Sequence, residues 1–275
     1  MEVLAQGTVR KMRSRLLTPV SYSLPLGDTD VELNELVEKK IKLEFLGEIH
    51  CVHCGRKTNK SFNQGYCYPC FQNLAQCDSC IIHPERCHHA QGTCREPGWG
   101  NKYCMQDHIV YLANSSGLKI GITRATQVPT RWVDQGATQA LPVIRVRTRL
   151  QSGLVETMFK QHVADKTNWR DMLKGTAEVL DMPSEAERLL ALCADELKEL
   201  ENTLGYFAIS VLRGLDTVEI KYPVTRYLDK IASFNFDKDP VIESTLLGIK
   251  GQYLIFEDGV INMRRFSGYK VSISH

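Results

Sequence analysis

A chain of 275 residues has the length of one large domain or of two to three small ones. Its hydrophobic fraction of 43% and charged fraction of 24% are typical of a globular protein. No apolar run reaches about eighteen residues, which argues against a membrane-spanning helix. The N-terminus also lacks the basic and apolar regions of a signal peptide. A cysteine-rich chain without an export signal suits a reducing compartment, so we expect a cytoplasmic protein whose thiols bind metal.

The formal net charge of +2 conceals a basic middle segment. Residues 102–175 contain eleven Lys or Arg and five Asp or Glu. Such a segment suggests a polyanionic partner, and nucleic acid, either DNA or RNA, is the partner we expect. A solvated surface is the simpler alternative. The basic side chains expected to contact nucleic acid are Arg124, Arg145, Arg147, Arg149 and Lys166.

Residues 1–50 are expected to form β-structure. A basic, alternating stretch surrounds Arg10, Lys11 and Arg13, and a Gly-Asp-Thr-Asp turn follows from Gly27. The basic residues could follow a phosphate backbone, and an exposed strand face is the alternative.

The first four cysteines form two Cys-x-x-Cys pairs, Cys51 with Cys54 and Cys67 with Cys70. Each pair makes a tight turn that directs two sulfurs at one point, and two such turns supply the four ligands of a tetrahedral Zn²⁺. A closed site of four thiolates leaves no open position for substrate, so we expect this zinc to be structural.

Five more cysteines follow. Cys77 and Cys80 are expected to form a ligand pair, but spacing does not choose the residues that complete their site. Candidate ligands of a second zinc are Cys77, Cys80, Cys87, Cys94, Cys104 and His88, with His89 and His108 as further candidates. Five thiols exceed one tetrahedral site by one. An iron–sulfur cluster remains an alternative, because four cysteines can also ligate iron.

A β-hairpin is expected next, with strands at residues 108–113 and 118–123 around an Asn-Ser-Ser-Gly turn. Pro129 and Thr130 begin a helix that carries Arg131. Residues 143–150 alternate strictly and are expected to form a strand with Arg145, Arg147 and Arg149 on one face. Ser152 is expected to cap a helix that runs to about residue 163 and carries Glu156.

This order of hairpin, arginine helix, strand and glutamate helix resembles the GIY-YIG nuclease superfamily. Ile109-Val110-Tyr111 matches the first signature of that superfamily, and Lys119-Ile120-Gly121 matches the second. The resemblance covers about residues 108–174. The whole chain also resembles an uncharacterised bacterial family in which a cysteine block precedes these motifs.

The resemblance implies a nuclease that hydrolyses phosphodiesters with Mg²⁺ or Mn²⁺. Glu156 would hold the metal, and Arg131 would hold the scissile phosphate. Tyr111, with a lowered phenol pKa, would help to deprotonate the attacking water. Lys119 replaces the second signature tyrosine and would contact phosphate. Glu156, Tyr111, Arg131 and Lys119 are thus the expected catalytic residues.

The expected fold is α+β, in five parts. They are an N-terminal β region at 1–50, a zinc-ribbon-like cysteine block at 51–107, a GIY-YIG-like α/β domain at 108–182, a helical linker at 183–215 and a C-terminal β region at 216–275. The linker helix is expected to begin at a capping box, Ser184 to Glu187, and to place Cys193 in the core. The C-terminal strands are expected to form a small barrel that the N-terminal strands join.

Three functions remain open at this point. The first is a zinc-stabilised nuclease acting on nucleic acid. The second is a non-catalytic zinc protein that binds RNA or DNA, on the ribosome or on tRNA. The third is an iron–sulfur or redox sensor.

Overall fold

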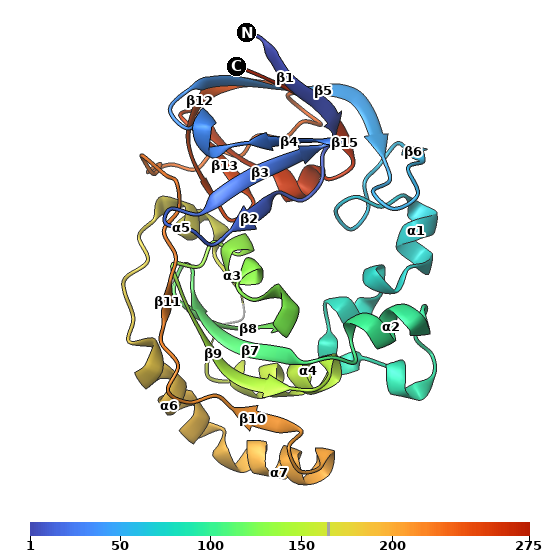
Figure 1. Cartoon of the computed structure of the whole chain (residues 1–275), viewed down its shortest axis with the longest axis vertical. Coiled ribbons are helices and arrows are strands. Elements are labelled where there is room, and N and C mark those ends of the chain that lie inside the picture. The colour runs from blue at the N-terminus through green and yellow to red at the C-terminus, as the bar shows by residue number, and fades with distance from the viewer. Residues whose placement is uncertain (164–165) are drawn as a thin grey trace.

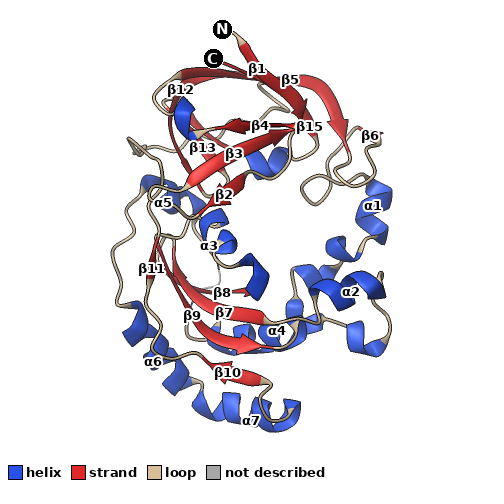
Figure 2. Ribbon diagram, in the orientation of Figure 1, coloured by secondary structure: helices blue, strands red, loops and turns tan. Residues whose placement is uncertain are grey.

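The computed structural model describes residues 1–163 and 166–275. It has a mixed α+β fold in which the sheets are antiparallel throughout the described residues (Figures 1 and 2). The two chain ends lie side by side, where Glu2 and His275 exchange two backbone hydrogen bonds. No helix among the described residues is long and apolar enough to cross a membrane.

The largest sheet joins the two ends of the chain, as the sequence predicted. Its strands follow the order β1-β15-β5-β12-β13-β14, with β6 paired to β5. Their bounds are β1 (Val3–Thr8), β15 (Tyr269–Ser274), β5 (Lys40–His50), β12 (Val241–Lys250), β13 (Tyr253–Phe256), β14 (Gly259–Asn262) and β6 (Lys57–Thr58).

The expected barrel does not form. Within the described residues β1 and β14 remain at opposite ends of the hydrogen-bonded order, so the sheet stays open. A separate small sheet packs beside it, made of β2 (Arg13–Arg15), β3 (Ser21–Leu26) and β4 (Thr29–Glu32). The basic N-terminal stretch therefore belongs to this second sheet and not to a barrel wall.

The expected hairpin is confirmed. Strands β7 (His108–Asn114) and β8 (Leu118–Arg124) pair without a register shift, and β9 (Gln139–Val146) pairs with β7 on the other side. Short strands β10 (Ile209–Val211) and β11 (Val218–Glu219) pair with β9 and complete this sheet.

The two faces of β7 enter different cores because alternate side chains point to opposite sides of a strand. Val110 and Leu112 pack with helices on one face. Tyr111 and Ala113 pack on the other face, with Trp132 and with the core of the large sheet. Strand β7 is thus fully buried, and Tyr111 lies where the two sheets share one hydrophobic cluster.

Helices cover the outer face of the β7–β9 sheet (Figure 2). These are α4 (Arg149–Phe159), α6 (Met182–Leu192) and α7 (Ala194–Leu204), while α3 (Thr130–Asp134) lies on the inner face and α5 (Trp169–Lys174) packs against the large sheet. The linker is two helices, since the first ends at Cys193. Asp181 caps it by accepting from the Ser184 N–H, so the expected cap at Ser184 is wrong, but Cys193 is buried as predicted.

The strand and helix around Arg149 also differ from the prediction. Strand β9 ends at Val146, and α4 starts three residues earlier than its expected cap at Ser152. Thr148 accepts from the Gln151 N–H while the Gln151 side chain bonds back to the Thr148 N–H, a capping box that ends the strand. Arg149 therefore leaves the row formed by Arg145 and Arg147 and begins a helix.

The cysteine block contains little regular structure. Helices α1 (Tyr68–Asn73) and α2 (Pro97–Tyr103) are separated by four 3₁₀ turns, at Ala75–Cys77, Ser79–Ile81, Pro84–Arg86 and His89–Gln91. Strand β6 folds back on the end of β5, so that Cys51 and Cys54 lie in the turn of a short hairpin. This hairpin is the ribbon-like half that the sequence predicted.

Candidate metal centres and phosphodiester site

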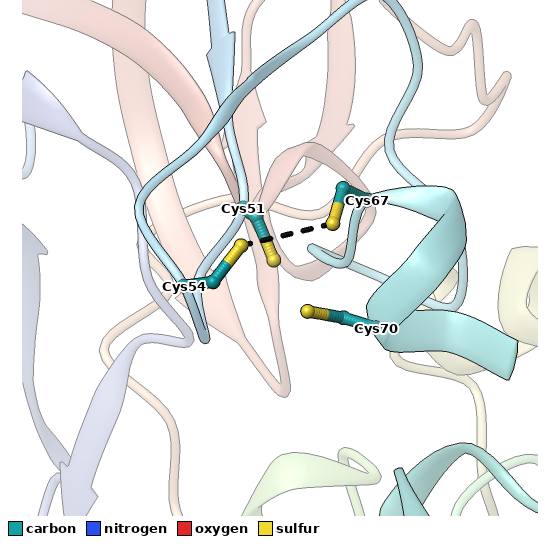
Figure 3. A group of neighbouring side chains, drawn as sticks. All are labelled: Cys51, Cys54, Cys67 and Cys70. Carbon is teal, nitrogen blue, oxygen red and sulfur yellow. Dashed lines mark hydrogen bonds between the residues drawn. The ribbon is translucent and has the colours of Figure 1, made fainter. Parts of the chain in front are cut away.

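The first metal centre is formed by the four cysteines that the sequence singled out. The sulfurs of Cys51, Cys54, Cys67 and Cys70 all lie within 4.8 Å of one another (Figure 3). The Cys54 and Cys67 sulfurs are 3.7 Å apart. Zinc bonded to four sulfurs at about 2.3 Å requires sulfurs about 3.8 Å apart, so this cluster could hold zinc with little movement. All ten cysteines of the chain are free thiols.

The backbone around this centre favours a thiolate. Burial raises the pKa of Cys51, but hydrogen bonds from the backbone of Cys54, Cys67 and His53 outweigh it and lower the pKa to about 6. Burial and the neighbouring thiols raise the pKa of Cys70. Four sulfurs cannot all carry negative charge side by side without a cation, and a bound metal would supply that cation.

A second group could also hold zinc. Ligand atoms of Asp78, Cys80 and His88 lie within 4.8 Å of one another. Asp78 was not predicted from the sequence, because a single carboxylate beside Cys77 has no distinctive spacing. Its carboxylate is already engaged, since Oδ2 lies 2.9 Å from Arg95 Nε and 3.4 Å from His88 Nε2.

The remaining cysteines separate into two sets. Burial raises the pKa of the Cys77 thiol, and Asn63, in the loop between the first two cysteine pairs, hydrogen-bonds to that thiol. Cys77 thus faces the first centre. Burial also raises the pKa of Cys80 and Cys104, each to about 11, and the thiols of Cys87 and Cys94 raise both values further.

Arg149 joins this second set to the sheet. Its Nε–H and one terminal N–H donate to the carbonyl oxygens of Cys80 and Ile81, at 3.3 and 2.6 Å. Its backbone N–H donates to the Cys104 carbonyl at 2.9 Å. Cys80 and Cys104 are therefore held by one residue. The expected contact of Arg149 with nucleic acid would compete with these bonds, since the guanidinium is engaged inside the protein.

The Tyr111 site lies on the inner face of the hairpin. Tyr111 is completely buried, its ring centroid is 5.9 Å from that of Trp132, and its hydroxyl donates to Gln135 Oε1 at 2.9 Å. Gly121 lies opposite it on β8, and any Cβ there would come within 2.8 Å of the phenol oxygen. The glycine of the second signature thus provides the space that the tyrosine of the first signature occupies.

The structure brings Arg131 and Glu156 near this phenol. Burial raises the pKa of Tyr111 to about 12, Arg131 lowers it by charge and by a hydrogen bond, and the charge of Glu156 raises it. The pKa of Tyr111 is therefore raised, whereas the sequence predicted a lowered pKa for a catalytic base. Glu156 is buried, whereas Arg131 is exposed.

The glutamate is paired with a lysine of its own helix. Lys160, one turn further along α4, lies 3.2 Å from the Glu156 carboxylate. Lys119 is buried and donates from Nζ to Thr167 Oγ1. Lys160 therefore balances the charge of Glu156. In the hairpin, Tyr111 pairs with Gly121 and Ala113 pairs with Lys119, so the two pairs lie two positions apart. Lys119 and Tyr111 consequently lie on the same face of the sheet.

The other predicted nucleic-acid contacts do not share one face of this sheet, because Arg124 pairs with His108 and Arg145 pairs with Ile109, the next residue of β7. The Arg124 guanidinium stacks 4.8 Å above the Tyr103 ring. Arg145 is exposed and 3.9 Å from Asp107, and Arg147 and Lys166 are exposed. Arg145 and Arg147 line a shallow pocket with Asp107. Among the predicted basic residues, Arg131 acts on the phenol by charge and by a hydrogen bond.

Comparison with known protein families identifies the family of this chain. The chain matches, over residues 38–271, the family described as protein of unknown function (DUF2797), which is well over half of its length. The protein is therefore a member of the DUF2797 family. No curated protein and no solved structure matches it.

Proposed function

We propose that the protein acts on nucleic acid as a zinc-stabilised, divalent-metal-dependent phosphodiesterase with a GIY-YIG-like site. One observation carries the proposal: Arg131 and Glu156, which are far from Tyr111 in the sequence, both act electrostatically on the Tyr111 phenol, and Arg131 also hydrogen-bonds to it. This supports the grouping of residues that the resemblance implies. The basic segment around these residues suits a polyanionic substrate.

In this proposal Glu156 holds the divalent cation, which supplies charge neutralisation at the leaving oxygen. A single carboxylate suits Mg²⁺, because this ion keeps several waters and binds substrate phosphates directly. Lys160 balances the carboxylate before the cation arrives. The donor set therefore fits the group that the resemblance implies.

Arg131 binds the phosphate. Its planar guanidinium can donate two parallel hydrogen bonds to phosphate oxygens, and its exposed position lets it meet a substrate. Tyr111 has a different role from the one expected. Since its pKa is about 12, it keeps its proton at neutral pH and donates that proton in a hydrogen bond to Gln135, so it positions its neighbours rather than acting as the base for water.

The test is cleavage of labelled DNA and RNA by purified protein with Mg²⁺ or Mn²⁺. Glu156→Gln should lower the cleavage rate by about 100-fold or more while the affinity for substrate stays. Glu185→Gln is the matched control, because this glutamate lies on α6 in an exposed pair with Arg188. Cleavage by Glu156→Gln at the wild-type rate would remove the catalytic assignment.

We further propose that the bound structural metals are two zinc ions. The first is held by Cys51, Cys54, Cys67 and Cys70. The second is held by Cys80, Cys87, Cys94 and Cys104, because thiolates are stronger zinc ligands than a carboxylate already paired with arginine. Cys77 is left over.

Metal analysis of three proteins tests this assignment. Wild type and Cys77→Ser should each contain two zinc ions per chain, and Cys94→Ser should contain one. A brown anaerobic preparation with iron and sulfide would refute zinc and favour the iron–sulfur alternative. Loss of a zinc from Cys77→Ser would refute the partition.

A non-catalytic protein that binds nucleic acid is the second candidate. The observation that favours it is the complete burial of Tyr111, whose hydroxyl already has a partner in Gln135. This function predicts salt-dependent binding with no turnover in any divalent metal. The cleavage assay above therefore separates the two candidates.

A further inference from the structure

A basic pocket lies at the junction of the N-terminal strands and the cysteine block. Its volume is about 400 Å³. Among the described residues that line it, none is acidic and four carry positive charge. The polar lining includes Arg10, Lys11, Arg13, Tyr66, His53 and Arg264. Arg10 and Arg264 are more than 250 positions apart in the sequence, so no local pattern could reveal this pocket.

Hydrogen bonds from the basic side chains hold the pocket walls together. Arg10 donates to the Val52 carbonyl at 3.1 Å, which links the N-terminal stretch to the turn of the first metal centre. Arg264, in the 3₁₀ turn Met263–Phe266, donates from Nε to Gln64 Oε1 at 2.9 Å. The two guanidiniums are thereby placed on either side of the cysteine loop, and neither forms an ion pair with a described residue.

The pocket adjoins the Tyr111 site through helix α3. Lys11 forms an ion pair with Asp134 at the end of that helix. The Gln252 side chain accepts a hydrogen bond from the Met12 N–H and donates one to the Met12 carbonyl. It also donates to Asp134 Oδ1 at 2.9 Å. In Figure 1, β2 adjoins α3, and the loop beyond β6 lies across from them.

Arg131 extends the line of positive charge from this pocket. Burial lowers the pKa of Arg264. Tyr66 and Asp134 act against this and raise it, while the charge of Arg131 lowers it, so Arg131 lies within electrostatic range of the pocket. The Arg10 and Arg264 guanidiniums form no ion pair with a described residue, so a bound anion would compensate their charge.

We propose that this pocket binds the backbone phosphates of the nucleic acid strand next to the phosphodiester held at Arg131. This inference rests on the proposed function, and it defines where the substrate strand lies. Guanidinium groups suit phosphate oxygens because they donate in pairs. The strand passes from Arg131 along Arg264 to Arg10, between the N-terminal stretch and the first metal centre.

Binding of a fluorescently labelled single-stranded oligonucleotide, as DNA and as RNA, tests this path. The variants are Arg10→Gln, Arg264→Gln and the pair together. Each lost phosphate contact should make the slope of log K against log salt shallower by about 0.7, so the double variant should lose about 1.4. Arg188→Gln is the matched control, because it removes an exposed arginine on α6.

Several results would overturn the inference. One is a double variant that keeps its fold, its zinc content, the wild-type affinity and the wild-type salt slope. Another is wild-type protein that binds neither oligonucleotide at low salt. The proposed function fails differently, by unchanged cleavage in Glu156→Gln. A double variant that binds weakly yet cleaves at saturating oligonucleotide supports the path, because the pocket positions the strand without touching the reacting atoms.

Discussion

Substituting Gly121 with alanine would place a Cβ atom 2.8 Å from both Cζ and Oη of Tyr111. Ordinary contacts between such atoms begin at about 3.5 Å, so one group has to move by about 0.7 Å. Gly121 has no positive φ, and the backbone accepts alanine without strain. Tyr111 cannot yield easily, because it is fully buried and packed on Trp132. The whole cost therefore arises from side-chain overlap.

The expected magnitude follows from two contributions. Overpacking a buried site costs about 1–3 kcal/mol. Displacing the phenol also weakens the hydrogen bond from Tyr111 to Gln135, which contributes about 0.5–1.5 kcal/mol. The sum is about 1.5–4.5 kcal/mol, which for a chain of this size lowers the melting temperature by roughly 3–18 °C.

Urea unfolding and thermal melting of Gly121→Ala measure this cost. Gly98→Ala is the control, because a Cβ at Gly98 meets no atom within 4 Å and Gly98 lies in helix α2. A Tyr111→Leu background should remove most of the penalty, because the overlapping atoms are gone. A Gly121→Ala variant as stable as wild type, or a penalty that persists in the leucine background, would refute the reasoning.

Two further predictions concern the metal centre and pH. Cys51→Ala should lose one zinc and expose residues 51–70 to hydrogen exchange, because zinc binding contributes roughly 10–16 kcal/mol of apparent free energy to such short segments. Protection equal to wild type would contradict a structural role. The second prediction concerns Lys250, because burial lowers its pKa from 10.5 to about 8. Between these two pH values the unfolded chain binds more protons than the folded chain, so the stability of the fold rises with pH. The destabilisation of the fold by the buried charge is therefore complete below pH 8 and is lost by pH 10.5. Relative to Lys250→Met, wild type should therefore gain about 3 kcal/mol of unfolding free energy over that window, measured by urea titration, and parallel curves would count against a buried charge.

The sequence alone was sufficient wherever function depends on residues close together in the chain. A candidate metal centre is indicated by the two Cys-x-x-Cys pairs, Cys51 with Cys54 and Cys67 with Cys70, because each pair makes its own turn. The hairpin at Tyr111 was predictable from two strand-like runs on either side of an Asn-Ser-Ser-Gly turn. The pairing of the two chain ends was also expected, since neither terminal region could bury a core alone.

Only the tertiary structure decided the rest. The strands of the terminal regions form an open sheet rather than a barrel, because β1 and β14 stay at its two edges. Spacing could not say that Cys77 faces the first centre or that Arg149 turns inward to Cys80 and Cys104. The physical reason is the same in each case. Packing between segments that are distant in the sequence selects these contacts, and a local sequence pattern does not specify which distant segment a residue will contact.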